Sequence, residues 1–294
     1  MSVGERDPHT GHMTTGHEWG GIKELNTPVP KPVIWFLIGT FIFSLIYWVL
    51  MPAWPLGVTY TRGLLGLDQR DEVMVRVAEG QAARADWVKA IAEGSFDSIQ
   101  DDEVLMDVVR GTGSSLFGDN CAVCHGLNGQ GGPGFPSLAA GSWLWGGEPE
   151  DVWETIRVGI NSDHPETRMS EMLAFGRDQI LDRSTILDVV AYLQSLPGSD
   201  DPQTPLDPEA VARGEETFAM QCTACHGENG QGDPAMGAPD LTDDVWIYGG
   251  DRDSLYWSIY RGRKGHMPHW EERLSPVERK ILTLYVLEIA KGRD

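Results

Sequence analysis

The chain has 294 residues, of which 41% are hydrophobic, and its formal net charge at pH 7 is −21. This length accommodates two domains of ordinary size, and the composition supplies apolar side chains for their cores. The excess of 44 acidic over 23 basic side chains argues against a nucleic-acid partner, because phosphate binding needs basic patches. The same charge would attract a basic protein, although acidic surfaces also serve solubility alone.

The first 32 residues form a polar segment rich in glycine, proline and histidine. Such a composition predicts an extended or partly disordered segment. Its histidines are loosely spaced and have no cysteine near them, so they do not indicate a metal site. We expect residues 1–32 to lie on the cytoplasmic side of the segment that follows.

An uncharged apolar segment runs from Val33 to Met51 and reads VIWFLIGTFIFSLIYWVLM. As a helix it would be about 28 Å long, enough to cross the hydrocarbon core of a bilayer. Aromatic side chains lie near both of its ends, as they do at membrane interfaces. A secretory signal peptide would be shorter and would end in a small-residue cleavage site, and a core helix is rarely apolar all round. We therefore predict a transmembrane anchor over residues 33–54.

Residues 55–107 are predicted to be a helical connector. After a turn-rich exit from the anchor, residues 71–91 place apolar side chains at helical spacing among charged ones. A second short helix is expected over residues 103–109.

The sequence then repeats itself. WLWGGEPEDVWETIRVG (143–159) matches WIYGGDRDSLYWSIYRG (246–262), and each copy continues to a methionine and an amphipathic helix that carries a tyrosine. The offset between the copies falls from 103 residues at these stretches to 95 at the methionines, so the first copy has eight extra residues there. A linker rich in proline and aspartate separates the copies. We expect two sequential domains, 108–198 and 208–294, joined by residues 199–207.

The last helix of the second copy has a start signal of its own. Ser275 and Glu278 have the spacing of a capping box, and Pro276 occupies the first helical position. We therefore expect a helix that begins at residue 276.

All four cysteines of the chain lie in two Cys-x-x-Cys-His motifs. Cys-x-x-Cys alone fits a redox dithiol, a zinc half-site or a haem attachment, but a histidine directly after the second cysteine indicates c-type haem. A zinc site would need two further ligands for each motif, and none stands at suitable spacing. The sequence therefore predicts two covalent haems c. The attaching residues are Cys121 and Cys124 for the first haem and Cys222 and Cys225 for the second, with His125 and His226 as axial iron ligands.

Each iron is expected to take a methionine as its sixth ligand, since methionine raises the reduction potential in electron-transfer cytochromes c. We predict Met172 for the first haem and Met267 for the second. The alternatives are Met169 and His164 for the first haem and His266 and His269 for the second. With both methionines bound no iron position is open, so the expected role is electron transfer without substrate chemistry.

The haem motifs also predict the orientation in the membrane. Haems c are attached outside the cytoplasm, so we expect the haem domains in the periplasm and the N-terminus in the cytoplasm. Three basic residues precede the anchor and two follow it closely, a weak bias in the same direction. The predicted location is the cell inner membrane, crossed once.

Two segments resemble the Pro-x-Leu element of small cytochromes c. They are PSL (136–138) and PDL (239–241), which follow His125 and His226. In those proteins the proline carbonyl accepts a hydrogen bond from the axial histidine, which implies this role for Pro136 and Pro239. The implied fold is mainly α, with the transmembrane helix followed by two tandem class I cytochrome c domains.

A wider resemblance covers nearly the whole chain. GHEWGGIKELNTPVPKP before the span, FGDNCAVCHG, WLWGG, MLAFG, QCTACHG and MPHW occur in this order. In this it resembles the dihaem CcoP family (subunit III) of cbb3-type cytochrome c oxidases. Two differences stand out: some relatives have a second span, and many have MP where this chain has ML.

The resemblance implies a membrane-bound, non-catalytic electron-transfer subunit of a respiratory oxidase. It would take electrons from a donor cytochrome c, soluble or membrane-anchored, and pass them to a monohaem cytochrome c subunit. The catalytic haem b–copper subunit would then reduce O2 to water. The alternatives are the dihaem subunit of a periplasmic dehydrogenase, a free membrane-anchored shuttle, and a dihaem peroxidase, which would need an open iron position.

Overall fold

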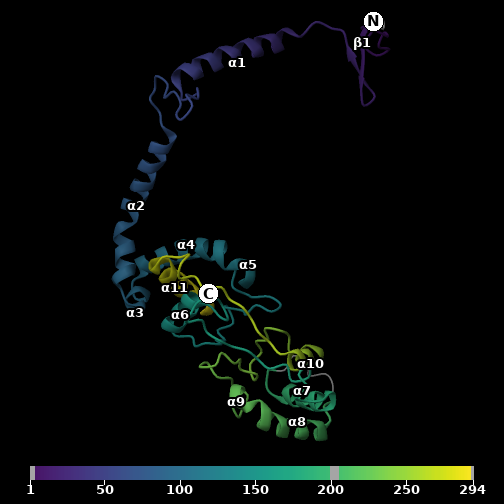
Figure 1. Cartoon of the computed structure of the whole chain (residues 1–294), viewed down its shortest axis with the longest axis vertical. Coiled ribbons are helices and arrows are strands. Elements are labelled where there is room, and N and C mark those ends of the chain that lie inside the picture. Colours follow the sequence, from purple (N-terminus) through teal and green to yellow (C-terminus); the bar gives the residue numbers. More distant parts are fainter. Residues whose placement is uncertain (1–3, 199–204, 293–294) are drawn as a thin grey trace. The chain divides into compact units, whose positions relative to one another are not determined.

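The computed structural model describes residues 4–198 and 205–292, which fall into two units that divide after Ala83. The described part is mainly helical, as the sequence predicts (Figure 1). Two strands, β1 (Thr14–Trp19) and β2 (Ile22–Leu25), precede the helices. The helices are α1 (Lys31–Leu50), α2 (Gln69–Glu93), α3 (Phe96–Gln100), α4 (Glu103–Asn120), α5 (Ala122–His125), α6 (Pro149–Val158), α7 (Arg183–Ser195), α8 (Pro208–Gln221), α9 (Thr223–His226), α10 (Arg252–Arg261) and α11 (Pro276–Ala290).

The N-terminal unit begins with an antiparallel hairpin where an extended or partly disordered segment was expected. Strands β1 and β2 pair with Trp19 opposite Ile22. Gly20 and Gly21 make the turn with φ of 58° and 87°. A two-residue hairpin turn of this kind needs positive φ at both positions, which glycine adopts without strain. The pair of glycines was therefore a hairpin signal within a polar composition.

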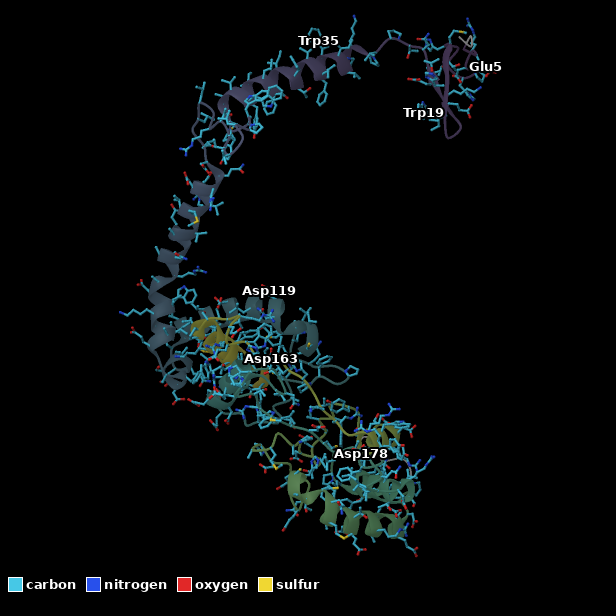
Figure 2. All side chains as sticks on the ribbon, viewed as in Figure 1. Glu5, Trp19, Trp35, Asp119, Asp163 and Asp178 are labelled. Carbon is cyan, nitrogen blue, oxygen red and sulfur yellow. The ribbon has the colours of Figure 1, made fainter. Side chains whose placement is uncertain are left out.

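Helix α1 matches the predicted anchor. It has 20 residues, its mean hydropathy is 2.3, and none of its side chains is buried within the protein. Figure 2 shows side chains standing out all around it, with Trp35 near its start. Pro32 lies in the first turn of the helix, where proline is tolerated. The chain leaves the helical conformation at Met51, because the residue before a proline disfavours it and Pro52 follows. Among the residues that the structure describes, one helix is thus long and apolar enough to cross a membrane.

The C-terminal unit begins within α2, and this end of the connector is fixed in place. Ile91 is fully buried in a hydrophobic core. The ammonium group of Lys280 on α11 donates to the carbonyl oxygens of Ile91, Ala92 and Gly94 at 3.0, 3.2 and 2.8 Å. These carbonyls lie at the helix end, where they have no intrahelical partner. Lys280 therefore joins the last turn of α2 to the final helix.

The C-terminal unit contains two hydrophobic cores. The first is built by α4, α6 and α11, with Phe117, Ile156 and Leu282 among its buried side chains. The second is built by α7, α8 and α10, with Val190 and Phe218 among its buried side chains. In Figure 1 the yellow helix α11 accordingly lies beside α4 and α6, while α7, α8 and α10 form a separate group.

This packing differs from two domains that follow one another at residues 108–198 and 208–294. Helix α7 precedes the linker but packs on α8 and α10, and α11 ends the chain but packs on α4 and α6. The boundary expected at residue 107 also falls inside α4. The two cytochrome domains thus exchange their last helices. Such an exchange costs little free energy, because each helix makes the same contacts that the equivalent helix of its own copy would have made.

Small residues mark the two exchanged helix crossings. A Cβ on Gly113 of α4 would lie 2.7 Å from Cβ of Tyr285 on α11. A Cβ on Gly214 of α8 would lie 2.9 Å from Cβ of Tyr192 on α7. The tyrosine that each copy carries in its last helix thus covers a glycine of the other copy, and only glycine permits this approach.

Candidate haem sites

Each Cys-x-x-Cys-His motif forms a short helical turn at the end of a core helix. The N–H of Cys121 still bonds to the carbonyl of Phe117 in α4, and the N–H of His125 bonds to the carbonyl of Cys121 at 3.0 Å. Cys222 and His226 repeat this arrangement after α8. Residues three and four apart share one face of a helical turn. Both thiols and the imidazole of each motif therefore present themselves on one side.

The two motif histidines are held through their Nδ1 atoms. Nδ1 of His125 lies 3.0 Å from the carbonyl oxygen of Pro136, and Nδ1 of His226 lies 3.1 Å from that of Pro239. A carbonyl only accepts hydrogen bonds, so Nδ1 carries the proton and Nε2 keeps its lone pair. Burial lowers the pKa of both imidazoles, more than the bond to the carbonyl raises it. Each ring is therefore neutral and can offer Nε2 to a metal.

Glycine loops bring these carbonyls within reach. Gly131 and Gly232 have φ of 74° and 77°. A Cβ on Gly131 would lie 2.7 Å from the carbonyl oxygen of Phe135, and one on Gly232 would lie 2.5 Å from that of Ala238. The loop therefore folds back directly before each proline only because no side chain intervenes.

The first cysteine of each motif is the more enclosed thiol. Burial, followed by the neighbouring cysteine, raises the pKa of Cys121 and of Cys222 to about 11. Both residues pack against hydrophobic cores, Cys121 against the first and Cys222 against the second.

Each predicted methionine ligand packs in the core of the other motif, and not in the core of the motif to which the sequence assigned it. Met267 packs against the first core, which contains Cys121, and Met172 packs against the second, which contains Cys222. Met267 and Ile160 exchange two backbone hydrogen bonds of 2.9 Å. Met172 and Arg263 exchange two of 2.8 and 3.2 Å. The sequence expectation had paired Met172 with the first motif and Met267 with the second.

The alternative ligands have other surroundings. The side chain of Met169 is 76% exposed. Nε2 of His164 lies 2.8 Å from Glu271, and its Nδ1 accepts a bond from the N–H of Glu166, so both ring nitrogens are engaged. His266 is exposed and its Nδ1 lies 2.9 Å from the carbonyl oxygen of Asn161. His269 faces Asp163 at 3.3 Å.

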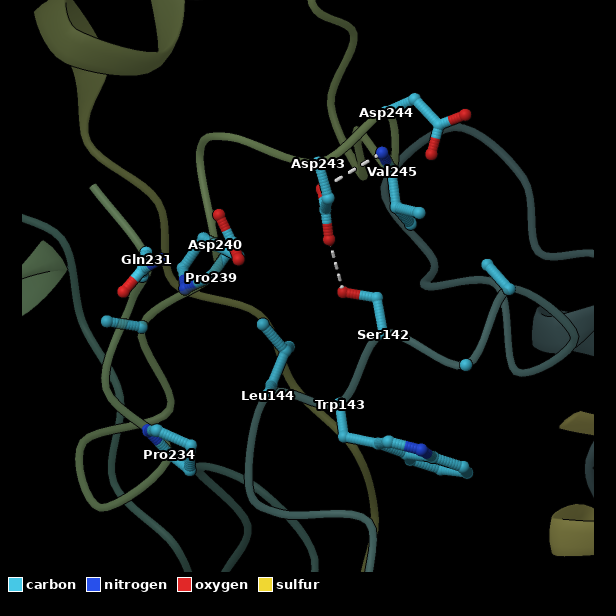
Figure 3. Close-up of a pocket in the computed structure, with 13 residues that line it drawn as sticks. Ser142, Trp143, Leu144, Gln231, Pro234, Pro239, Asp240, Asp243, Asp244 and Val245 are labelled. Atoms are coloured by element: carbon cyan, nitrogen blue, oxygen red, sulfur yellow. Dashed lines mark hydrogen bonds between the residues drawn. The ribbon is translucent and has the colours of Figure 1, made fainter. Parts of the chain in front are cut away.

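The loops of the two motifs meet around a cavity of about 360 Å³. Figure 3 shows Ser142 of the first copy donating a hydrogen bond of 2.7 Å to Asp243 of the second. Trp143, which packs on the first core, and Pro239, which holds His226, also line the cavity. The two motif regions are therefore neighbours within one unit.

These residues fit a c-type haem at each motif. Each offers two thiols, a neutral imidazole with a free Nε2, and a thioether packed in the same core. The side chains also include buried hydrogen-bond donors without a protein partner, Nε1 of Trp145 and Nε of Arg168 among them. Within residues 4–198 and 205–292, no group of three or more His, Cys, Asp or Glu side chains offers a further metal site.

Comparison with known proteins assigns the family. Residues 11–58 match the N-terminal domain of cytochrome oxidase-cbb3, FixP, residues 111–197 match cytochrome c, and residues 209–286 match subunit III of cbb3-type cytochrome c oxidase. The chain is 43% identical to subunit FixP of Bradyrhizobium sp. (strain ORS 278) over 98% of each chain. It is 43% identical to subunit CcoP of Azospirillum brasilense over the whole of both chains.

The chain belongs to the CcoP/FixP family of cbb3-type cytochrome c oxidase subunits. As a CcoP-type protein it carries two covalent c-type haems and is an electron-transfer subunit of the oxidase. It is membrane-anchored, and α1 is the helix suited to that purpose. The identity predicted from the sequence is thereby confirmed.

Sequence reasoning did not find the exchange between the two CcoP cytochrome domains. The repeat identifies equivalent positions but does not say which copy closes which core. The tyrosines of the last helices were visible as part of the repeat, yet they fit sequential and exchanged packing equally well.

Proposed function

We propose that this subunit is the electron-input arm of the oxidase, with its haem domains in the periplasm and residues 1–32 in the cytoplasm. It accepts electrons from a donor cytochrome c and passes them to a monohaem cytochrome c subunit, which serves the catalytic haem b–copper subunit. Support comes from the two Cys-x-x-Cys-His motifs, whose haems are attached outside the cytoplasm, behind a single apolar helix. The haem iron supplies reversible one-electron exchange when bound.

The haem ligands proposed for this role follow the packing and not the order of the sequence. The first haem takes Cys121, Cys124 and His125 from its own motif and Met267 as its sixth ligand. The second haem takes Cys222, Cys225 and His226 from its motif and Met172 as its sixth ligand. The observation that supports this pairing is the reciprocal packing of Met267 with the Cys121 core and of Met172 with the Cys222 core.

The role of Pro136 and Pro239 belongs to the same proposal. Each proline carbonyl fixes the tautomer and orientation of its histidine, so that Nε2 faces the iron. Their hydrogen bonds to His125 and His226 support this role.

The ligand pairing is tested in full-length chains that hold one haem each. In a Cys121→Ala/Cys124→Ala chain only the second haem remains. There Met172→Ala should abolish the methionine–iron charge-transfer band in the red, and Met267→Ala should preserve it. A Cys222→Ala/Cys225→Ala chain should give the opposite result. Met169→Ala is the control, and it should leave the band of either single-haem chain intact. Loss of the band with the methionine of the same sequence copy would refute the exchange.

The role in the oxidase is tested by oxygen uptake of the complex that co-purifies with the chain in mild detergent, with a reduced artificial donor. We expect cyanide-sensitive uptake and a haem b signal. A complex with two haems c per chain but no uptake would contradict the oxidase partner. Orientation is tested with an N-terminal epitope, which protease should remove from inside-out vesicles and leave intact in spheroplasts.

A further inference from the structure

Two half-buried arginines lie beside the methionine segments, each against an aromatic ring. The guanidinium carbon of Arg168 lies 5.1 Å from the ring centroid of Trp145, and that of Arg263 lies 4.0 Å from the ring centroid of Tyr248. Trp145 and Tyr248 are equivalent residues of the repeated WLWGG and WIYGG stretches. Both copies of the repeat therefore place an arginine against the aromatic residue at this position.

The two arginines come from different positions in the repeat. The repeat aligns Arg263 with Ile160, which has no charge. In the first copy the eight extra residues form a loop that turns back, and Arg168 pairs alongside Ile160 as a parallel neighbour. Ile160 pairs on its other side with Met267, while Arg263 pairs directly with Met172. The inserted loop thus places Arg168 against Trp145 from a position in the repeat that differs from that of Arg263, which lies against Tyr248.

Neither arginine has a carboxylate partner that accounts for its position. Nη2 of Arg168 donates to the backbone carbonyl of Asp151 at 3.1 Å, the Asp151 carboxylate is 4.0 Å away, and Nε has no partner. Arg263 donates only to the hydroxyl of Ser258, at 3.0 and 2.7 Å, and no carboxylate in the described part of the chain pairs with it. Desolvation accordingly lowers the pKa of Arg263. Although the chain has 44 acidic residues, neither of these half-buried guanidinium groups has a close carboxylate to offset its partial loss of hydration.

A further donor beside Arg168 also lacks a partner. The indole Nε1–H of Trp145 is fully buried and makes no hydrogen bond. A buried donor left without an acceptor destabilises the folded protein, because it loses its hydrogen bond to water and gains none in return. Two adjacent unsatisfied donors, one of them on a cation, therefore point to an anionic acceptor that belongs to this place.

The cofactor carries such an acceptor, because each haem has two propionate carboxylates. We propose that Arg168 with Trp145 binds a propionate of the first haem and that Arg263 with Tyr248 binds a propionate of the second. Charge-assisted bonds from a guanidinium suit a carboxylate, and the ring above each guanidinium holds it in place. The assignment of each pair to a haem rests on the methionine pairing proposed above.

The test is spectroelectrochemical titration of the detergent-solubilised full-length chain, read together with the propionate bending bands in its resonance Raman spectrum. Chains lacking the Cys121/Cys124 or the Cys222/Cys225 attachment assign the two potential components. Arg168→Gln should shift the first component to a more negative potential, because losing a nearby positive charge favours the oxidised iron. Arg263→Gln should shift only the second. The propionate bands should move in each case, while the methionine–iron band persists.

Further variants separate a propionate contact from a structural role. Trp145→Phe removes the N–H donor and keeps a smaller aromatic ring without changing the charge, so it should move the propionate band of the first haem with a smaller change in potential. Arg168→Lys keeps the charge and should shift the potential less than Arg168→Gln. Arg177→Gln is the control, because Arg177 is exposed and paired with Asp178, and it should change neither readout.

Unchanged propionate bands in Arg168→Gln and Arg263→Gln would overturn the proposal, even if the potentials moved. Shifts that appear in the opposite haems would overturn the assignment of each pair to its haem. Failure of the methionine pairing is seen separately, in the charge-transfer bands of the methionine variants, which do not depend on either arginine.

Discussion

At the scale of single residues, Gly131 controls the loop that carries the proline carbonyl to His125. Its φ of 74° lies in the left-handed region, and the space where a Cβ would stand is filled by the backbone of residues 135–137. The neighbouring Gly132 does not have a positive φ, and no atom lies within 4 Å of the position that its Cβ would take. The two glycines therefore form a matched pair for mutation.

We expect Gly131→Ala to destabilise the first haem site by about 1–3 kcal/mol, from left-handed strain and from overlap with the carbonyl of Phe135. The displaced loop should weaken the bond between Pro136 and His125. The measurement is the midpoint of thermal loss of the methionine–iron band in the purified holoprotein. Gly132→Ala should leave this midpoint nearly unchanged, and equal effects from both variants would contradict the steric argument.

At the scale of helices, the crossing of α4 and α11 joins the two ends of the C-terminal unit. Gly113 lies at the crossing, directly against Tyr285, whereas Gly111 on the same helix has nothing within 4 Å of its Cβ position. The partner helix is the last one in the chain, although α4 carries the first haem motif. Substitution at Gly113 therefore reports on the exchange itself.

Gly113→Ala should push α11 away from α4 and destabilise the first haem site by about 1–3 kcal/mol. Gly111→Ala should be neutral or stabilising by up to about 1 kcal/mol, since alanine favours a helix over glycine. Denaturant titrations of the holoprotein, followed at the methionine–iron band, would measure both changes. If Gly113→Ala instead disturbed only the second haem, the packing of α11 on α4 would be refuted.

The sequence predicts the helices better than it predicts their partners. The anchor is recognisable from an unbroken apolar run, and the capping box at Ser275 and Glu278 is present at the start of α11 as expected. These features depend on local chemistry. Helices α7 and α11 are similar and both carry a tyrosine, so local sequence does not decide which of them packs on α4. The hairpin over residues 14–25 was missed because composition outweighed the Gly20–Gly21 turn.

The sites show the same division between local and distant determinants. Cysteines and histidines are fixed by motif spacing, and Pro136 and Pro239 by a short loop. The relation of Arg168 to Trp145 could not be read from the repeat, because the first copy places its arginine at a position that the second copy lacks. The structure shows that the inserted loop returns beside Ile160, and that Arg168 thereby takes the same place against its aromatic ring as Arg263 does.

At the scale of the whole molecule, the exchange should make the two cytochrome domains one cooperative structure. Each core contains helices from both sides of the linker, so neither can unfold alone without releasing part of the other. A Cys222→Ala/Cys225→Ala chain, which lacks the second haem, should therefore also lose stability at the first. Thermal loss of the first haem's methionine–iron band measures this, and an unchanged midpoint would show independent domains.

The net charge of −21 acts over the whole surface. Reduction by a soluble basic cytochrome c should be fastest at low ionic strength and should slow as salt screens the attraction. Stopped-flow reduction at several salt concentrations measures this effect. A small uncharged reductant is the control, and its rate should be independent of salt. An equally flat response with the basic donor would show that electrostatic steering does not operate.

The exchange also constrains how the protein is made. When the chain has been synthesised only as far as α7, the first Cys-x-x-Cys-His motif has its proline loop but not the helix that closes its core. Haem can be attached to that motif early, yet the core around it stays open until α11, the last described helix, has been made and has packed on α4. The first core therefore stays incomplete while the 99 residues after Ser195 are still to be made. A chain that stops before α11 would therefore leave its first haem site open to solvent, even though every residue of the first Cys-x-x-Cys-His motif is present.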